Sequence, residues 1–306
     1  MTATRPRDHD PQAAHDGRDG SEWSPPPLRL RQLTLDWTRT CVVGVLNVTP
    51  DSFADGGQHA GLEAAVAHGH ALWRAGADII DVGGESTRPR STPVSAEEEL
   101  RRVLPVIERL RAEVPLPLSI DTYKARVAAE ALAAGADLVN DVSGGRLDPG
   151  IFAAAGRAGA PVIVGHLRGQ PATMQDAITF ADLVTEVVAE LRESAARAEG
   201  QGAYAIVDPG LGFGKTAAHN LQLLARLGEV RAACRRPLCV GPSRKAFLGV
   251  VTGAKVDERL LPSVAAAAIC AFNGADLVRV HDVAEAVAAV KVADAVRRGL
   301  PAGAGA

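Results

Sequence analysis

Residues 75–86 read AGADIIDVGGES, and this stretch shows the unit from which the fold is built. A glycine ends a helix-like segment, the largely apolar run 78–82 begins two residues later, and polar Glu85 lies just past the run. Glycine after a helix takes the left-handed capping conformation, and connections from helix to strand are short in α/β folds. The stretch therefore predicts a helix end, a buried strand and a polar side chain at the carboxyl end of that strand.

An apolar run that leads to a polar side chain occurs eight times along the chain, and a helix-end glycine precedes five of these runs. The other runs are residues 41–46, 117–120, 137–140, 161–164, 204–207, 238–240 and 276–280, and the polar residues past all eight are Asn47, Glu85, Asp121, Asp141, His166, Asp208, Ser243 and His281. Strands that are covered on both faces are continuous in Val, Ile and Leu rather than alternating. Eight strand–helix units close into a (β/α)8 barrel, whose active site lies at the carboxyl ends of the strands. We therefore predict a single TIM barrel with these polar residues around its active site.

Helical stretches separate the runs, and the two ends of the chain differ from them in composition. The stretches have apolar residues three or four apart and cover residues 62–75, 95–113, 123–134, 149–158, 180–199, 217–231, 262–273 and 283–298. Residues 28–36 alternate weakly, which predicts a hairpin that plugs the amino end of the barrel. Residues 1–27 are rich in Pro, Gly, His and charges, so we expect a disordered tail before one barrel domain, 28–300, and a short flexible terminus, 301–306.

Composition argues against several classes of partner. The 306 residues are 47% hydrophobic and carry a formal net charge of -3, so nothing favours a nucleic-acid or an anionic-membrane partner. No apolar run approaches the ~18–20 residues of a membrane helix, and residues 1–27 lack the apolar core of a secretory signal. None of the four cysteines forms a CxxC pair, which favours buried reduced thiols and fits a cytoplasmic location.

Two of the loops that follow strands are long. Residues 47–61 and 83–94 form these loops, and long loops in a compact domain are typically lids or binding segments. Asn47 starts the first loop, and its amide oxygen suits a magnesium ion that also binds substrate phosphates, although it could equally cap the strand end. In the second loop, Arg88 can meet a carboxylate or a diphosphate.

Three polar residues end or follow the third, fourth and sixth runs, and they should converge on one pocket. They are Asp121, Asn140 and Asp208. Two carboxylates and an amide suit a flat heterocycle with an edge of N–H donors, because carboxylates accept paired, charge-assisted hydrogen bonds. The alternative is that Asp121 and Asp208 cap the helices that follow them. The glycine cluster 212–215 lacks GxxxxGK[ST], which favours Phe213 as a cover for the edge of a ligand ring over a phosphate loop.

Basic residues follow the seventh and eighth strands. Ser243 and Lys245 lie in GPSRK, 241–245, and Arg279 and His281 lie at the end of the last strand. Barrels often bind phosphate at these two loops, where helix amino termini present N–H groups. A solvated basic face is the alternative, but it does not explain an arginine at a strand end followed two residues later by a histidine. The pattern therefore predicts an anion site, and with it an enzyme for an anionic, phosphorylated heterocycle.

Seven segments of the sequence resemble one family. They are, in chain order, GVLNVTPDSFADGG, DVGGESTRP, SIDT, DLVNDVSGG, IVDPGLGFGK, GPSRKAFLG and RVHDV. These motifs resemble those of the dihydropteroate synthases of folate biosynthesis, and the likeness runs from about residue 41 to 298. The resemblance implies a transferase that condenses 6-hydroxymethyl-7,8-dihydropterin diphosphate with 4-aminobenzoate and releases pyrophosphate and 7,8-dihydropteroate.

The motif match also implies a role for each candidate residue. The pterin would be bound by Asp121, Asn140, Asp208, Lys245 and the edge of Phe213. The diphosphate would be bound by Asn47, Arg279 and His281, with Asn47 also reaching the magnesium ion. The aminobenzoate would be framed by Phe53, Thr87, Arg88, Pro89 and Ser243. Catalysis is assigned to Asp121, Lys245, Asp55 and Arg88, and the family implies a homodimer formed through its last helices.

The implied chemistry is a dissociative substitution. Loss of diphosphate from the pterin methylene leaves a stabilised cation, so the protein needs no nucleophile and has to neutralise the departing anion and stabilise the cation. Magnesium, Arg279 and His281 would do the first, and Asp121, Asp208 and Asp55 the second. Closure of the two long loops would exclude water that would otherwise capture the cation.

Two positions depart from the family pattern. Gly165 stands where the family has methionine, which predicts a roomier pocket floor, and Arg90 replaces the glycine that follows Arg-Pro in the second loop.

Two alternative functions share the pterin pocket. A methyltransferase between methyltetrahydrofolate and a corrinoid protein would not need the NVTPDSF, ESTRP and GPSRK segments. A catalytically silent paralogue is expected to lack Lys245, Arg279 or Asn47, and all three are present.

Overall fold

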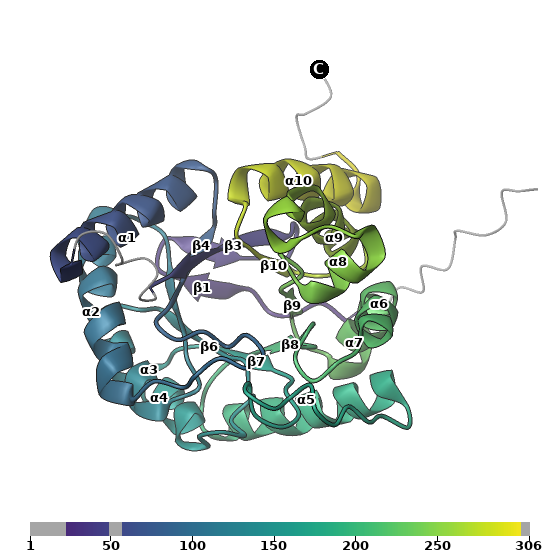
Figure 1. Cartoon of the computed structure of the whole chain (residues 1–306), viewed down its shortest axis with the longest axis horizontal. Helices are drawn as coiled ribbons and strands as arrows, with labels where there is room; N and C mark the ends of the chain where they lie inside the picture. The colour runs from purple at the N-terminus through teal and green to yellow at the C-terminus, as the bar shows by residue number, and fades with distance from the viewer. Residues whose placement is uncertain (1–22, 49–56, 301–306) are drawn as a thin grey trace, which may run out of the picture.

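The computed structural model describes residues 23–48 and 57–300, and its main feature is a closed ring of parallel strands (Figure 1). Eight strands pair in the order β8-β7-β6-β5-β4-β3-β10-β9, and a parallel bridge between Val207 and Leu238 joins the two ends of the sheet. They are β3 (Cys41–Asn47), β4 (Ile79–Gly83), β5 (Leu118–Asp121), β6 (Leu138–Asp141), β7 (Val162–Gly165), β8 (Ala205–Asp208), β9 (Cys239–Val240) and β10 (Leu277–Val280). Each strand overlaps one predicted run, so the predicted (β/α)8 barrel is confirmed.

Helices surround the ring of strands (Figure 1). They are α1 (Gly57–Arg74), α2 (Ala96–Glu113), α3 (Ala125–Ala133), α4 (Gly150–Ala158), α5 (Leu183–Gly200), α6 (Ala217–Ala225), α7 (Leu227–Cys234), α8 (Ala246–Thr252), α9 (Leu260–Phe272) and α10 (Val283–Arg298), with a 3-10 turn at Val256–Glu258. Within the described part of the chain, none of them is long and apolar enough to span a membrane.

The helices differ from the prediction in three places. α1 begins at Gly57, so it takes the end of the predicted loop 47–61. The predicted helix 217–231 is divided into α6 and α7, because Arg226 leaves helical geometry with a ψ of 23°. The sequence analysis does not predict α8, because its seven residues are too few to show helical periodicity.

The amino end of the barrel is closed by the predicted hairpin. β1 (Leu28–Leu30) and β2 (Leu33–Leu35) pair antiparallel, and Leu30, Leu35 and Trp37 are buried in one cluster with inward-facing strand residues. Those strand residues are Cys41, Val43, Ile79, Leu138, Ile163, Ile206, Cys239 and Leu277. Residues 23–27, which the sequence assigns to the tail, also lie against the barrel, since Trp37 Nε1 donates to the Pro26 carbonyl at 2.9 Å. Residues 1–22 lie outside the described residues.

The repeated Ala-Gly-Ala-Asp or Asn-Gly-Ala-Asp segment has a structural role at this end of the barrel. Asp78, Asp137 and Asp276 precede β4, β6 and β10, and each carboxylate accepts a hydrogen bond from a backbone N–H of the neighbouring strand at 2.8–2.9 Å. Each also pairs with an arginine, in order Arg39, Arg111 and Arg231. These three acids therefore hold adjacent strands in register and lie far from the carboxyl ends.

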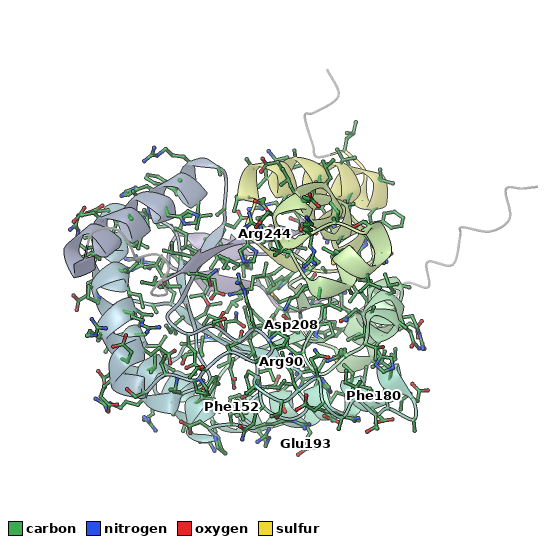
Figure 2. The ribbon with its side chains drawn as sticks, viewed as in Figure 1. Arg90, Phe152, Phe180, Glu193, Asp208 and Arg244 are labelled. Carbon is green, nitrogen blue, oxygen red and sulfur yellow. The ribbon has the colours of Figure 1, made fainter. Side chains whose placement is uncertain are left out.

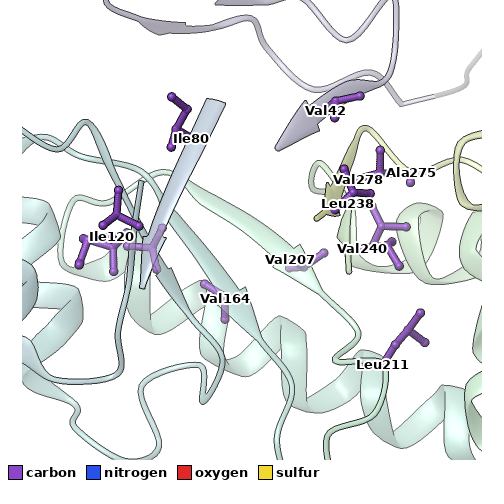
Figure 3. Packing of buried hydrophobic residues seen from close by; sticks show 14 of the residues in the cluster. Val42, Ile80, Ile120, Val164, Val207, Leu211, Leu238, Val240, Ala275 and Val278 are labelled. Carbon is purple, nitrogen blue, oxygen red and sulfur yellow. The ribbon is translucent and has the colours of Figure 1, made fainter. Parts of the chain in front are cut away.

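Side chains on the outer face of the strands pack beneath the helices (Figure 3). Ile80, Ile120, Val164, Val207 and Val278 are fully buried there. Burial of one such side chain stabilises a fold by about 1.5–3 kcal/mol. The alternate residues of the same strands face the apolar hairpin inside the barrel. Both faces of each strand are therefore apolar there, which explains why the strands appear in the sequence as continuous apolar runs.

Candidate active site

The inward-facing residues change from apolar to polar toward the carboxyl ends of the strands. Side chains two residues apart point to the same face of a strand. Polar residues therefore lie one step above the plug residues in four strands, as Asp81 above Ile79, Asn140 above Leu138, Asp208 above Ile206 and Arg279 above Leu277. Asp121, the last residue of β5, is also buried. These five side chains form what we call the polar layer.

Arg279 joins two carboxylates of the polar layer. Its Nε lies 2.5 Å from Asp81 Oδ2, and its Nη2 lies 2.5 Å from Asp121 Oδ2. Asn140 Nδ2 also donates to Asp81 Oδ2, at 3.0 Å. The second oxygen, Oδ1, of both aspartates is buried and has no hydrogen-bond partner among the described residues. A buried acceptor without a partner is costly, so these two oxygens are well suited to accept N–H groups of a ligand.

Asp81 is a residue of the polar layer that was not predicted from the sequence, although its position within the apolar run could have indicated it. The residue lies inside the run 78–82, two positions after inward-facing Ile79, and is fully buried in β4. A carboxylate at the inward position of an apolar strand indicates a site, because burying an unpaired charge is strongly unfavourable. The predicted residues Asp121, Asn140 and Arg279 are brought together around it.

Burial dominates the electrostatics of the polar layer. It raises the pKa of Asp121, an effect that the Arg279 charge opposes and the Asp81 charge reinforces. It also raises the pKa of Asp208, whose Oδ1 accepts a hydrogen bond from the backbone N of Gly210 at 2.7 Å. Burial lowers the pKa of Lys245 to about 8, with a further contribution from Arg279. The site therefore combines acceptors and cations in an environment with little water.

Lys245 and Phe213, which the motif match assigns to the pterin, are in contact. The Nζ of Lys245 lies 4.0 Å from the centre of the Phe213 ring, a cation–π contact. Gly212 lets the two loops approach, because a Cβ on it would lie 3.1 Å from Lys245 Cδ and its φ is +82°. The loops after β8 and β9 therefore form one wall of the site.

Ser243 and His281 are also in contact. Ser243 Oγ lies 3.0 Å from His281 Nδ1 and accepts a hydrogen bond from the His281 backbone N at 3.2 Å. The pKa of His281 is lowered to about 3, first by burial and then by the charges of Arg279, Arg244 and Arg88. Burial and the neighbouring positive charges therefore disfavour protonation of this imidazole. The three arginines supply the positive field for an anion.

Three polar residues that follow runs contact other side chains or backbone groups of the protein, unlike the expectation that all eight face the active site. Asp141 accepts hydrogen bonds from Ser143 N and Gly145 N and so shapes the loop after β6. His166 is buried against Lys215, whose Nζ lies 2.9 Å from its Nδ1. Glu85 bonds to residues at the start of α3.

The remaining predicted residues lie on the long loops. Asn47 ends β3 and is exposed, Thr87 is half-buried, and Arg88 and Pro89 are exposed. Phe53 and Asp55, assigned to the aminobenzoate and to catalysis, lie outside the described residues.

Gly165 does not enlarge the pocket floor. A Cβ on this residue would lie 2.6 Å from Val142 Cα and 2.7 Å from Val142 O, distances that real side chains do not adopt. The backbone after β6 fills the space that the family's methionine would need. The expectation of a roomier pocket at Gly165 is therefore wrong, because backbone atoms of Asp141 and Val142 already occupy the space next to Gly165 Cα.

Comparison with known proteins identifies the family. A family model described as pterin binding enzyme matches residues 43–281, which include most of the barrel and all of the polar layer. The fold and the site therefore define a barrel enzyme of the pterin-binding class.

Relatives and solved structures narrow this class. The dihydropteroate synthase of Synechocystis sp. is 44% identical over 283 residues, which cover 91% of this chain and 98% of that protein. A crystal structure of the Yersinia pestis dihydropteroate synthase with a sulfonamide drug has a TM-score of 0.83 and 44% identity, and the match covers 89% of this chain and 99% of that one. The Xanthomonas albilineans enzyme in complex with 7,8-dihydropteroate has a TM-score of 0.80 at 44% identity, with 90% and 100% covered. The chain belongs to the dihydropteroate synthase family, as its motifs predict.

Proposed function

We propose that this chain condenses 6-hydroxymethyl-7,8-dihydropterin diphosphate with 4-aminobenzoate to give 7,8-dihydropteroate and pyrophosphate. The observation that carries the proposal is the polar layer, in which two buried carboxylates each keep an acceptor oxygen without a partner beside Arg279. Membership in the dihydropteroate synthase family supports it, and one relative binds the product of this reaction.

The residues divide by charge between the two halves of the pterin substrate. Asp121, Asn140 and Asp208 present oxygens to the N–H edge of the pterin, and carboxylates there also favour a cation that forms on the ring system. Lys245 also binds the pterin, and Arg279 lies beside these acids and favours the departing diphosphate. No side chain is needed as a nucleophile, because the amine of the second substrate attacks the pterin methylene and the C–O bond to diphosphate breaks.

Magnesium is the proposed cofactor, with Asn47 as its protein ligand. The described residues contain no group of three or more His, Cys, Asp or Glu side chains that could hold a metal ion. The single amide oxygen of Asn47 fits magnesium, because this ion commonly takes one or two protein oxygens and fills its other positions with phosphate and water. Bound there, the ion would neutralise charge on the leaving diphosphate.

The test is pyrophosphate release by the purified protein with dihydropterin diphosphate and magnesium, with and without 4-aminobenzoate. Release that requires aminobenzoate, with dihydropteroate formed in equal amount, supports the synthase. Lys245→Ala should lower the rate by about 10²-fold, because one charge stabiliser of the transition state is lost. Lys255→Ala, at an exposed position of the 3-10 turn, is the control. Pterin binding without release would identify a catalytically silent paralogue.

We also propose a homodimer formed through the last helices, in a reducing, cytoplasmic compartment. The four cysteines are buried and unpaired, which suits that compartment. Helices α8, α9 and α10 lie together on one side of the barrel (Figure 1), and they carry exposed apolar side chains. They are Val250, Val251, Leu260, Leu261, Ile269, Phe272, Val292 and Val296. Exposed apolar patches commonly mark interfaces, and a self-complementary patch on one copy meets the same patch on a second.

Light scattering tests the homodimer. Phe272→Glu, on α9, should shift the mass from that of two chains to that of one, because a charge would be buried between two copies. Leu221→Glu, at an exposed apolar position on α6, should leave the mass unchanged. A monomeric native protein would contradict the proposal.

A further inference from the structure

We propose that Glu85, Tyr123 and Lys124 are positioning residues for the loop between β4 and α2, and that they set the affinity for 4-aminobenzoate. We call these three side chains the Glu85 cluster. The identity of the ligand rests on the proposed function, whereas the contacts of the cluster do not depend on it. The cluster lies outside the polar layer, and neither the motif match nor the site chemistry assigns it a ligand.

Glu85 closes the base of the loop. Its Oε1 accepts a hydrogen bond from the Tyr123 hydroxyl at 2.7 Å, and its Oε2 accepts one from the Lys124 ammonium. The backbone N of Val94 also donates to Oε2, at 3.4 Å. One carboxylate therefore joins the two ends of the segment 85–94 and ties both to the connection between β5 and α3.

Glu85 is buried, Tyr123 and Lys124 are half-buried, and one lysine balances the charge of the cluster. The side chains of Glu85 and Lys124 are 5% and 17% exposed. Lys124 also pairs with Glu99 in the first turn of α2, whose side chain is 1% exposed. Burial raises the pKa of Glu99, an effect that the hydrogen bond from Lys124 opposes. A buried ion pair of this kind holds its geometry closely, because separating the charges is costly.

The chain next to the cluster is fixed as well, whereas the tip of the loop is not. Arg102 Nη1 donates to the Gly84 carbonyl at 2.8 Å, and a Cβ on Gly84 would lie 2.7 Å from Val103 Cγ1. From residue 86 to 93, the hydrogen bonds in the described structure stay within the loop, such as Ser91 N to the Arg88 carbonyl at 3.1 Å. The loop therefore has a rigid base and a tip that follows the base.

The tip of the loop lies at the active site. The charge of Arg88 contributes to the lowered pKa of His281, which places its guanidinium within electrostatic reach of the end of β10. In Figure 2, Arg90 and Asp208 both project inside the ring of helices. A displacement of about 1 Å in residues that position a substrate can cost roughly 10²-fold in rate. The Glu85 cluster is thus placed to set the position of Thr87, Arg88 and Pro89 against the second substrate.

Two variants of the full-length protein test the proposal without removing the lysine. Glu85→Gln weakens both charge-assisted bonds, and Tyr123→Phe removes one hydroxyl and nothing else. Each should raise KM for 4-aminobenzoate by about tenfold, the loss expected when roughly 1.4 kcal/mol of positioning is removed. The Kd of dihydropterin diphosphate, measured without aminobenzoate, should change by less than about twofold, since the polar layer is untouched. Hydrogen exchange of backbone amides 86–95 should become faster in both variants.

Glu99→Gln is the matched control, because the Glu99 side chain shares Lys124 but accepts no hydrogen bond from residues 85–94 in the described structure. It should leave both the aminobenzoate KM and the loop exchange at native values. The proposal is overturned if Glu85→Gln leaves loop exchange unchanged, or if Glu99→Gln changes both readouts as much. If the native protein forms no dihydropteroate, the proposed function fails instead, and loop exchange still decides whether the Glu85 cluster holds the loop.

Discussion

The guanidinium of Arg279 lies 2.5 Å from the carboxylate of Asp121, and the same guanidinium lies 2.5 Å from Asp81. β10 therefore supplies the one arginine that two carboxylates, from β4 and β5, share inside the barrel. Asp81 is fully buried, and Asp121 is nearly so. Arg279, which we propose as a ligand of the diphosphate, thus has a second role. It compensates the negative charge of Asp81 and Asp121 in the interior of the folded protein.

Arg279→Met should therefore destabilise the fold as well as impair the reaction. Removing one partner of a buried ion pair costs about 3–5 kcal/mol, because the other charge remains buried and uncompensated. The measurement is the free energy of unfolding in urea. Adding Asp81→Asn to Arg279→Met should recover part of the loss, because one uncompensated carboxylate disappears. Arg244→Met, which breaks the exposed pair with Asp282, should cost less than about 1 kcal/mol. Equal losses in the two single variants would contradict this account.

Binding of the pterin diphosphate should weaken as pH rises above about 8. Burial lowers the pKa of Lys245 to about 8, so the ammonium is present below that pH and lost above it. The pterin substrate binds the charged form more strongly, because an ammonium makes charge-assisted hydrogen bonds to its acceptor atoms, and affinity should fall up to about tenfold for each pH unit above the pKa. Calorimetry without aminobenzoate, from pH 6.5 to 9.5, measures the effect. Lys245→Met should bind weakly and lack this fall, while titration of the ligand itself affects both proteins equally. A native profile that matches the variant's would remove Lys245 from the binding site.

Gly165→Ala should lower stability by more than about 1–3 kcal/mol, the usual cost of overpacking a core, because the new methyl group meets backbone rather than a movable side chain. Gly200→Ala is the matched control. Gly200 ends α5, and a Cβ there meets nothing within 4 Å. It should be neutral or slightly stabilising, because alanine restricts the unfolded chain. Thermal unfolding compares the two, and a harmless Gly165→Ala would show that the loop at Val142 can move away.

The fold is largely readable from the sequence because a barrel repeats one unit. Glycine at the helix end, an apolar run and a polar residue recur with little variation, and each run overlaps one strand of the structure. What the repeats cannot show is local geometry. The break at Arg226 depends on how α6 and α7 pack, and α8 is too short for a period to appear.

The site is only partly predictable from the sequence, because the sequence does not show the direction of a side chain or its local hydrogen bonds. Asp121, Asn140 and Arg279 lie at strand ends, where polar type and position coincide, and the structure brings them together. Asp81 is hidden inside a run, because its inward direction shows only once strand parity is known. Conversely, Asp141 looks like a site residue but serves its own loop. A polar residue after a strand is therefore a poor site candidate when both of its side-chain oxygens bond to the backbone of its own loop, as in Asp141.

Arg90→Gly should change KM for aminobenzoate more than it changes the affinity for the pterin substrate. Arg90 stands where the family has glycine, and its φ of 64° is in the left-handed region, which costs a residue with a side chain about 1 kcal/mol or more. Glycine relieves that strain and removes a charge at the tip of the loop, whereas the pterin pocket lies on the strands below. Steady-state kinetics with each substrate varied in turn measures the two effects.

The control for strain alone is Arg235→Gly. Arg235 follows α7 with a φ of 50°, is exposed, and lies at the amino end of the barrel just before β9, away from the site. Arg235→Gly should alter stability as Arg90→Gly does and leave both kinetic constants at native values. If Arg90→Gly instead weakens pterin binding and spares the aminobenzoate KM, the tip of the loop lies over the pterin pocket and not at the second substrate. The charge of Arg90 and not its backbone conformation matters if Arg90→Ala, which removes the charge but keeps a Cβ in the left-handed region, reproduces the glycine variant.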